Sequence, residues 1–245
     1  MDTNLLFNTL IQVDSTNNYA TRQIREGLAL HGNAWFTPHQ TQGKGQRGKH
    51  WESEANKNLA ISIVIQPPQC FNNSPFVFNM FVAHACAVFL EELVQQKIHI
   101  KWPNDLFMND RKAGGLLIEN TFRGQQWNWS TIGIGINLNQ TEFSSSAGHP
   151  ISLNQVTGLL YDPEEIARKL HKHLFSNINI IGETDLNTIQ QSYNSRLYQR
   201  DRLVQLRKDN EVFQCTIKEV DASGQLIVDD GTKKYIQHGA VEWLI

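Results

Sequence analysis

The chain has few cysteines and no cysteine-rich motif. Cys70, Cys86 and Cys215 are far apart, and no C-x-x-C pair occurs among the 245 residues. Zinc ribbons, dithiol redox sites and disulfide frameworks all need closely spaced cysteines. We therefore expect free thiols in a reducing compartment, and a fold that is stabilised by an ordinary hydrophobic core.

A charge excess and a targeting segment are also lacking. The formal net charge is −2, so any site for nucleic acid or phosphate must be local. The start, MDTNLLFNTL, is not a signal peptide, because it has no basic segment followed by an apolar run. The most apolar run, 76–93, is interrupted by Asn79 and His84, and we expect it to be too short and too polar to cross a membrane. These absences predict a cytoplasmic protein.

The order of the predicted elements favours an α+β fold for residues 1–197. Asp162 followed by Pro163 is the clearest helix start, with an N-cap residue and then proline at the first position. A first helix should follow the capping residues Asp14, Ser15 and Thr16 and end near Gly32. Apolar periodicity predicts further helices at 76–96, 162–178 and 184–199, and strands at 11–13, 34–38, 58–68, 98–102, 105–108, 113–122 and 129–139.

The character of the chain changes near residue 200. Short apolar runs then alternate with the turn sequences DNE, DASG, DDG and QHG. This pattern is typical of a small β-barrel. We therefore place a domain boundary at about residue 198, which separates an α+β domain at 1–197 from a β domain at 198–245.

The loop QGKGQRGKHW, residues 42–51, has the spacing of a dinucleotide-binding fingerprint, G-x-G-x-x-G. That fingerprint needs a helix directly after it and an acidic residue about 20 positions further on. Here the polar stretch after the loop leads to the predicted strand 58–68, and Pro67 and Pro68 stand in place of the acid. A Rossmann site is therefore excluded, and the Walker A pattern is absent.

The same loop still has the composition of an anion site. Its glycines allow backbone N–H groups to approach oxygens closely, and its lysines and arginine add full charges. A flexible, solvated turn is the simpler alternative. A nucleic-acid loop is a second alternative, although the chain has no other basic stripe.

A second unusual stretch is KWPNDLFMNDRKAGGLLIEN, residues 101–120. Asn104 and Asp105 offer the oxygen ligands that Mg²⁺ prefers, but Pro-Asn-Asp is also ordinary turn chemistry. Lys112 precedes paired glycines inside an apolar strand, where glycine usually indicates the close approach of a ligand or of another backbone. A solvated hairpin lysine is the alternative for Lys112.

Alternate glycines recur in IGIGINLN, residues 132–139. Gly133 and Gly135 lie on one face of the predicted strand, and Asn137 follows on the same face. A face without side chains leaves room for a flat ligand. A bulge or tight strand packing is the alternative.

Taken together, five segments in this order resemble the biotin–protein ligase family. They are DSTN (14–17), QTQGKGQRGKHW (40–51), KWPND (101–105), K-x-G-G-x-L-x-E (112–119) and the G-I-N run (135–137). The resemblance implies a class II synthetase-like catalytic domain, with a mixed central sheet flanked by helices, and a C-terminal SH3-like β-barrel. Some members carry an N-terminal helix-turn-helix domain, for which we expect no room before residue 14, and hence no binding of operator DNA.

The resemblance implies a two-step ligation. The carboxylate of biotin would attack the α-phosphate of ATP to give biotinyl-5′-AMP and pyrophosphate. A lysine amine of a biotin carboxyl carrier protein would then attack the acyl-adenylate. Biotin and ATP are the implied substrates, and Mg²⁺ would accompany the phosphates. The expected protein is a monomer or a homodimer with no membrane partner.

The resemblance also assigns roles to residues. Lys112 is the expected catalytic residue, contacting both the carboxylate and the α-phosphate, and Asp105 is a candidate magnesium ligand. The implied biotin-binding residues are Ser15, Thr16, Asn17, Gln40, Lys44, Gly45, Gln46, Lys112, Gly114, Gly115 and Leu117. Those implied on the ATP side are Arg47, Lys49, Trp51, Asn104 and Asn137.

The chain departs from the family pattern at Lys44 and Gln46, where many members have arginine. Gln46 is neutral and cannot supply that positive charge to the acyl-adenylate. The loop 140–150 also differs from longer arginine-containing versions, and we assign it no adenine contact. A lipoate– or octanoate–protein ligase is the nearest alternative, although its R-R-x-S-G-G-G segment is absent. A non-enzymatic nucleotide- or nucleic-acid-binding module is the alternative from another class.

Overall fold

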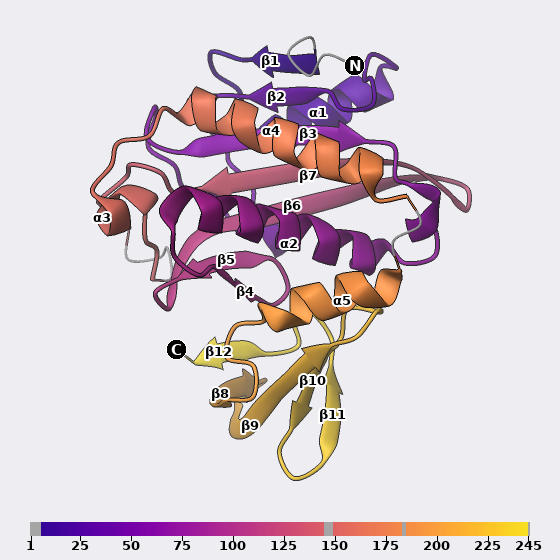
Figure 1. Cartoon of the computed structure of the whole chain (residues 1–245), viewed down its shortest axis with the longest axis vertical. Coiled ribbons are helices and arrows are strands. Elements are labelled where there is room, and N and C mark those ends of the chain that lie inside the picture. Colours follow the sequence, from indigo (N-terminus) through magenta and orange to yellow (C-terminus); the bar gives the residue numbers. More distant parts are fainter. Residues whose placement is uncertain (1–5, 145–148, 183–184, 245) are drawn as a thin grey trace.

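The central feature is a seven-stranded mixed sheet, seen in a computed structural model that describes residues 6–144, 149–182 and 185–244. Its strands lie in the order β1-β2-β3-β7-β6-β5-β4 (Figure 1). Neighbouring strands are antiparallel, except for the parallel pair of β1 and β2. In sheet order the strands are β1 (Phe7–Thr9), β2 (Ala34–Phe36), β3 (Leu59–Ile65), β7 (Gln126–Ile136), β6 (Arg111–Arg123), β5 (Asp105–Met108) and β4 (His99–Lys101).

The two faces of this sheet are covered by different helices. On β3, Ile61 and Ile63 belong to the main core, whereas Val64 packs with Ala20 of α1 in a second, smaller cluster. Because side chains alternate along a strand, α1 lies on the face opposite the main core. Helices α2 and α4 cover the other face (Figure 1). The helices are α1 (Thr16–Arg25), α2 (Pro75–Val94), α3 (Leu153–Thr157), α4 (Pro163–Ile180) and α5 (Leu186–Ser195).

Among the described residues, helix α2 is the one helix that is both long and strongly apolar. Its 20 residues and mean hydropathy of 1.6 would suffice, by length and composition alone, to cross a membrane. The expectation that this segment is too short was therefore wrong. However, 61% of its apolar window is buried inside the protein. Such burial is expected of a helix that packs in the core of a folded domain.

A second, five-stranded antiparallel sheet follows α5. Its order is β11-β10-β9-β8-β12. Asn194 at the end of α5 joins this sheet to the rest of the protein, because its Nδ2 donates to the Val220 carbonyl at 3.0 Å and its Oδ1 accepts from the Val220 N–H at 2.8 Å. The strands are β8 (Leu203–Lys208), β9 (Glu211–Val220), β10 (Leu226–Asp229), β11 (Lys233–Ile236) and β12 (Glu242–Leu244). The predicted α+β class with a small C-terminal β unit is confirmed.

Several predicted boundaries need correction. Helix α1 ends with Glu26 as its C-cap rather than near Gly32. Ser15 is its N-cap residue, but its side chain makes no capping hydrogen bond. The strand expected at 11–13 is only a single bridge between Val13 and Gln40. Helix α3 and strand β1 were not predicted.

The start of α4 matches its prediction. Asp162 is the N-cap, and its carboxylate accepts hydrogen bonds from the backbone N–H groups of Glu164 at 2.9 Å and Glu165 at 3.2 Å. The two acidic residues in the first turn also favour the helix dipole. Local chemistry alone fixed this helix start.

Candidate active site

A cavity of about 1100 Å³ opens on the α1 side of the sheet. The start of α1, the loop 40–52, strands β4 to β7 and the C-terminal strand β12 surround it. Of the predicted site residues, those that line it are Ser15, Thr16, Asn17, Gln40, Lys44, Gly45, Gln46, Arg47, Lys49, Trp51, Asn104, Asp105, Lys112, Gly115, Leu117 and Asn137.

Gly114 is the predicted site residue that does not line the cavity. A Cβ atom at this position would lie 2.7 Å from the carbonyl oxygen of Gly135 on the neighbouring strand. The glycine is therefore needed for close packing of β6 on β7. Its expected role as a wall of the pocket is wrong, whereas Gly115, which faces the other side, does line the cavity.

One end of the cavity is closed by a buried polar cluster. The side-chain oxygen of Gln40 accepts from the Thr16 backbone N–H at 2.8 Å and from the Thr16 hydroxyl at 3.1 Å. The Ser62 hydroxyl lies 2.8 Å from the Thr16 hydroxyl and 2.5 Å from the Asn17 side-chain oxygen. A single hydroxyl proton can serve only one of these acceptors at a time. Each of these groups thus has a partner within the protein, and their oxygens keep spare capacity to accept.

Asn17 extends this cluster across the sheet. Its Nδ2 donates to the Leu117 carbonyl at 3.1 Å and to the Glu119 carboxylate at 2.8 Å. Ser62 and Glu119 were not predicted as site residues. Ser62 could have been noticed as the one polar side chain in the apolar run 59–65, because a buried hydroxyl requires a partner.

The space above the alternate glycines of β7 is partly filled by the protein itself. A Cβ atom on Gly133 would overlap the amide of Asn17, and one on Gly135 would lie 2.5 Å from the Trp51 ring. Both glycines nevertheless line the cavity, so these two side chains take up only part of the room that we predicted for a flat ligand. The glycines let α1 and the loop 40–52 approach the sheet closely, which sets the depth of the cavity.

The loop folds back on itself as a tight hairpin. The Gly45 N–H donates to the Lys49 carbonyl at 2.7 Å, and the Trp51 N–H donates to the Gly43 carbonyl at 2.9 Å. A short 3₁₀ turn, η2 (Gln46–Gly48), forms the tip. The next regular element is β3 rather than a helix, so the geometry also excludes a dinucleotide-binding turn.

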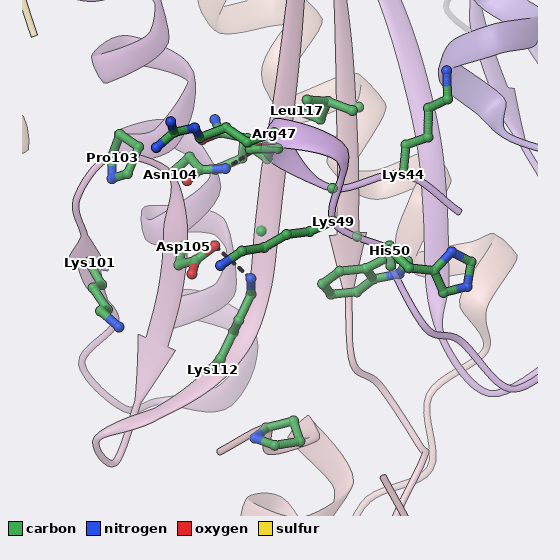
Figure 2. A pocket seen from close by; sticks show the side chains of 18 of the residues that line it. Lys44, Arg47, Lys49, His50, Lys101, Pro103, Asn104, Asp105, Lys112 and Leu117 are labelled. Carbon is green, nitrogen blue, oxygen red and sulfur yellow. Dashed lines mark hydrogen bonds and ion pairs between the residues drawn. The ribbon is translucent and has the colours of Figure 1, made fainter. Parts of the chain in front are cut away.

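The three cations of this loop point in different directions. Lys49 extends toward Asp105 and Lys112, and Arg47 extends toward the turn that carries Asn104 (Figure 2). Lys44 points away from both and donates to the Asn18 side chain at 2.5 Å. Two of the three predicted cations therefore face the cavity centre, and Lys44 lines its edge.

Lys112 and Asp105 form an ion pair at the mouth. The Lys112 ammonium lies 2.7 Å from Asp105 Oδ1 and 5.8 Å from the centre of the Trp51 ring. Both partners remain about a quarter exposed, at 27% and 26%. A pair that is exposed in this way adds little stability, because water and salt screen it. It does, however, hold the ammonium at a fixed place.

The predicted metal ligand has only partial support. Among the described residues, no cluster of three or more His, Cys, Asp or Glu side chains could hold a metal ion, and Asp105 is already paired with Lys112. Mg²⁺ commonly uses one or two carboxylates together with substrate phosphates. This donor set fits an ion that arrives with a nucleotide better than an ion that is resident in the protein.

The two predicted asparagines hold strand β6. The Asn104 amide donates to the Leu116 carbonyl. The Asn137 amide donates to the carbonyls of Lys112 and Ile151, both at 3.2 Å. Their N–H groups are thus engaged with backbone, and their clearest role is to fix the strand that carries Lys112.

Lys101, His238 and Trp243 are among the residues that line the cavity but were missed from the sequence. The Lys101 ammonium lies 5.1 Å from the Phe107 ring centre and 5.5 Å from that of Trp243. Burial, and then the charges of Lys112 and Lys49, lower the pKa of Lys101 from 10.5 to about 8, although Asp105 opposes this shift. Burial, followed by the charge of Arg47, also lowers the pKa of His238.

Comparison with known proteins places this site in a family context. A sequence model of the biotin/lipoate A/B protein ligase family matches residues 9–137. The chain is 29% identical over 233 residues to the bifunctional ligase/repressor BirA of Escherichia coli, covering 91% of this chain and 69% of that protein. It is 32% identical over 162 residues to the biotin–[acetyl-CoA-carboxylase] ligase of Paracoccus denitrificans, covering 64% of this chain and 66% of that protein.

The fold also matches solved structures. The biotin protein ligase of Aquifex aeolicus in complex with biotin and ATP superposes with a TM-score of 0.80 at 23% identity, covering 97% of this chain and 98% of that one. The biotin protein ligase of Leishmania major in complex with biotin gives a TM-score of 0.66 at 23% identity, with 95% and 98% coverage. At these identities the likeness concerns the fold.

Proposed function

Because the chain belongs to the biotin/lipoate A/B protein ligase family and is therefore a ligase, we propose that it activates biotin with ATP and transfers it to a lysine of an acceptor protein. The Lys112–Asp105 pair at 2.7 Å carries this proposal. It fixes one ammonium at the mouth of a cavity whose loop adds two further cations, Arg47 and Lys49. Such a site suits a reaction in which a carboxylate must approach a phosphate.

In the first step, a carboxylate oxygen of biotin forms a bond to the α-phosphorus of ATP. The bond from that phosphorus to the bridging oxygen breaks, and pyrophosphate leaves. Negative charge builds on the phosphoryl oxygens, and the Lys112 ammonium is positioned to stabilise it. Lys49 and Arg47 screen the repulsion between the two anions. A magnesium ion bound to the phosphates would supply further screening, and Asp105 could contact it only by sharing its carboxylate with Lys112.

In the second step, the amine of an acceptor lysine attacks the carbonyl carbon of the acyl-adenylate, and AMP leaves. The mixed anhydride must be kept from water until the acceptor arrives. The hairpin 43–51 is the element that can cover it, because it crosses the mouth with Trp51 packed on Gly135.

The buried polar cluster favours biotin over lipoate. Thr16, Asn17, Gln40 and Ser62 present amide and hydroxyl groups at the closed end of the cavity. The ureido ring of biotin has two N–H donors and a carbonyl acceptor to match them, whereas the dithiolane ring of lipoate has neither. These groups already pair with one another, so the ureido N–H groups would use the acceptor capacity that remains on their oxygens, which a dithiolane ring cannot use.

The acceptor that we propose is the lysine-bearing domain of a biotin carboxyl carrier protein. The relative from Paracoccus denitrificans is named for ligation to acetyl-CoA carboxylase, which supports this class of acceptor. We propose the cytoplasm as the place of reaction, since ATP is available there.

Biotin-dependent exchange of pyrophosphate into ATP tests the first step with the purified chain. We expect exchange with biotin and little with lipoate or octanoate. Exchange with lipoate but not biotin would reject biotin as the substrate and leave the ligase chemistry in place. Transfer is tested separately by mass spectrometry of a purified carrier domain, with its acceptor lysine replaced by arginine as the control.

A further inference from the structure

The tip of the loop makes a close contact with the C-terminal sheet. The guanidinium of Arg47 lies directly on the backbone of Gly239, in the turn between β11 and β12. A Cβ atom on Gly239 would overlap Nη1 and Cζ of Arg47 and lie 2.9 Å from its Nε. No side chain other than hydrogen can therefore coexist with Arg47 in this position.

The turn that carries Gly239 is held from both sides. The Ala240 N–H donates to the Gln237 carbonyl at 3.0 Å and closes the turn. The His238 ring packs edge-on against Trp102, with 5.8 Å between ring centres, and Trp102 Nε1 donates to the Gly224 carbonyl at 3.0 Å. The turn on which the Arg47 guanidinium lies is thus attached to the β4–β5 segment of the seven-stranded sheet as well as to the C-terminal sheet.

Arg47 itself is held in an unfavourable backbone conformation. Its φ of +55° lies in the left-handed region, which a non-glycine residue adopts only at a cost. Arg47 has no hydrogen bond or ion pair with any residue in the part of the chain that the structure describes. Its donors are therefore available to an anion in the cavity, and the contact with Gly239 is what constrains their position.

We propose that Gly239 is a positioning residue that seats the Arg47 guanidinium at the cavity mouth, so that the C-terminal sheet controls where the loop places this cation. This inference rests on the proposed function, in which Arg47 faces the phosphates of ATP. Replacing the hydrogen of Gly239 by a methyl group displaces the Arg47 guanidinium from the Gly239 backbone and loosens the hairpin 43–51.

The test is Gly239→Ala, with Gly231→Ala as its matched control. Gly231 lies in the neighbouring β10–β11 turn with φ +102°, and a Cβ atom there would meet no atom within 4 Å. Both substitutions therefore strain a turn of the same sheet, but only one displaces Arg47. In biotin-dependent pyrophosphate exchange, we expect Gly239→Ala to raise the KM for ATP about tenfold, in line with the loss of one charge-assisted contact. The KM for biotin should change less than twofold.

A combined variant distinguishes an effect of Gly239 that acts through Arg47 from a general loss of structure. If Gly239 acts through Arg47, then Gly239→Ala together with Arg47→Ala should have the same KM for ATP as Arg47→Ala alone. Losses that multiply in the combined variant, or equal losses in Gly231→Ala, would overturn the proposal.

A readout without catalysis keeps this test independent of the proposed function. Trypsin cleaves after exposed lysines, at a rate that follows the open population of the loop. Cleavage after Lys49, followed by mass spectrometry, should be severalfold faster in Gly239→Ala and in Arg47→Ala than in the wild type and Gly231→Ala. Equal cleavage in all four proteins would show that Gly239 does not position Arg47, even if exchange is observed. Faster cleavage in Gly239→Ala and Arg47→Ala, without any biotin-dependent exchange, would support the positioning role of Gly239 and reject the proposed function.

Discussion

The Asn137 side chain donates to the backbone carbonyl of Lys112 at 3.2 Å, so the residue that follows β7 fixes the residue that enters the cavity from β6. The backbone of Lys112 is held a second time, because its N–H donates to the His149 carbonyl and its carbonyl accepts from the Ile151 N–H, both at 2.9 Å. The ammonium is then aimed by Asp105. Lys112 thus has the rigid support that electrostatic catalysis requires, since a preorganised charge needs no reorganisation during the reaction.

The first prediction concerns this charge. Lys112→Met keeps the length and most of the apolar stem but removes the ammonium. We expect biotin-dependent exchange to fall by a factor on the order of 10²–10³, because one stabilising charge is lost in the transition state. The melting temperature should change little, since the pair is a quarter exposed. Lys169→Met, on the exposed face of α4, serves as the control and should retain full exchange; a similar loss there would contradict the assignment.

The second prediction concerns the buried polar cluster. Asn17→Ala removes one of the two partners of the buried Ser62 hydroxyl, leaves the exposed Glu119 carboxylate to water, and opens space above Gly133. Loss of a buried hydrogen bond typically costs about 1–3 kcal/mol. We expect the free energy of unfolding in urea to fall by that order, and the stabilisation by saturating biotin to be lost. A variant that is destabilised but still gains the wild-type increment from biotin would show that Asn17 supports the fold alone.

The sequence predicted features that depend on local chemistry. Asp162 with Pro163 sets the start of α4, and the apolar run 59–65 forms strand β3. By contrast, the end of α1 was misplaced because Gly27, with φ +72°, stops the helix earlier than Gly32 does. Propensity alone does not decide between two nearby glycines.

For the candidate site, too, the sequence predicted some features and missed others. The motifs indicated which residues gather at the cavity, but not what each one touches. Gly133 and Gly135 accommodate Asn17 and Trp51 while still lining the cavity, and this depends on contacts between distant segments. His238 and Trp243 were missed because the C-terminal segment reaches the cavity only in the folded chain, and Lys101 was missed because its burial against Trp243 depends on the same segment.

The third prediction is a pH dependence that originates at Lys101. Burial lowers the pKa of Lys101 to about 8 in the folded protein, against 10.5 for the free group. Between these values the unfolded chain binds more protons, so the free energy of unfolding rises with pH. The penalty for burying the charge is therefore present below pH 8 and is relieved as the pH increases toward 10.5.

Lys101→Met removes this penalty while keeping the stem between the rings of Phe107 and Trp243. At pH 7 the variant should be more stable than the wild type by up to about 3 kcal/mol. The difference should shrink steadily between pH 8 and pH 10 in urea unfolding curves. A difference that does not vary with pH would show that packing, rather than the buried charge, separates the two proteins.

The fourth prediction concerns Gln46, which begins the 3₁₀ turn at the tip of the loop and lines the cavity. Gln46→Arg adds a cation at this position. The added charge should slow the release of biotinyl-5′-AMP about tenfold, as expected for one charge-assisted contact. The release rate can be measured by trapping free adenylate after rapid gel filtration of the loaded protein. Gln42→Arg adds the same charge to an exposed position outside the cavity lining, and it should leave the release rate unchanged. Equal slowing by both variants would indicate a general electrostatic effect of the loop rather than a contact made at position 46.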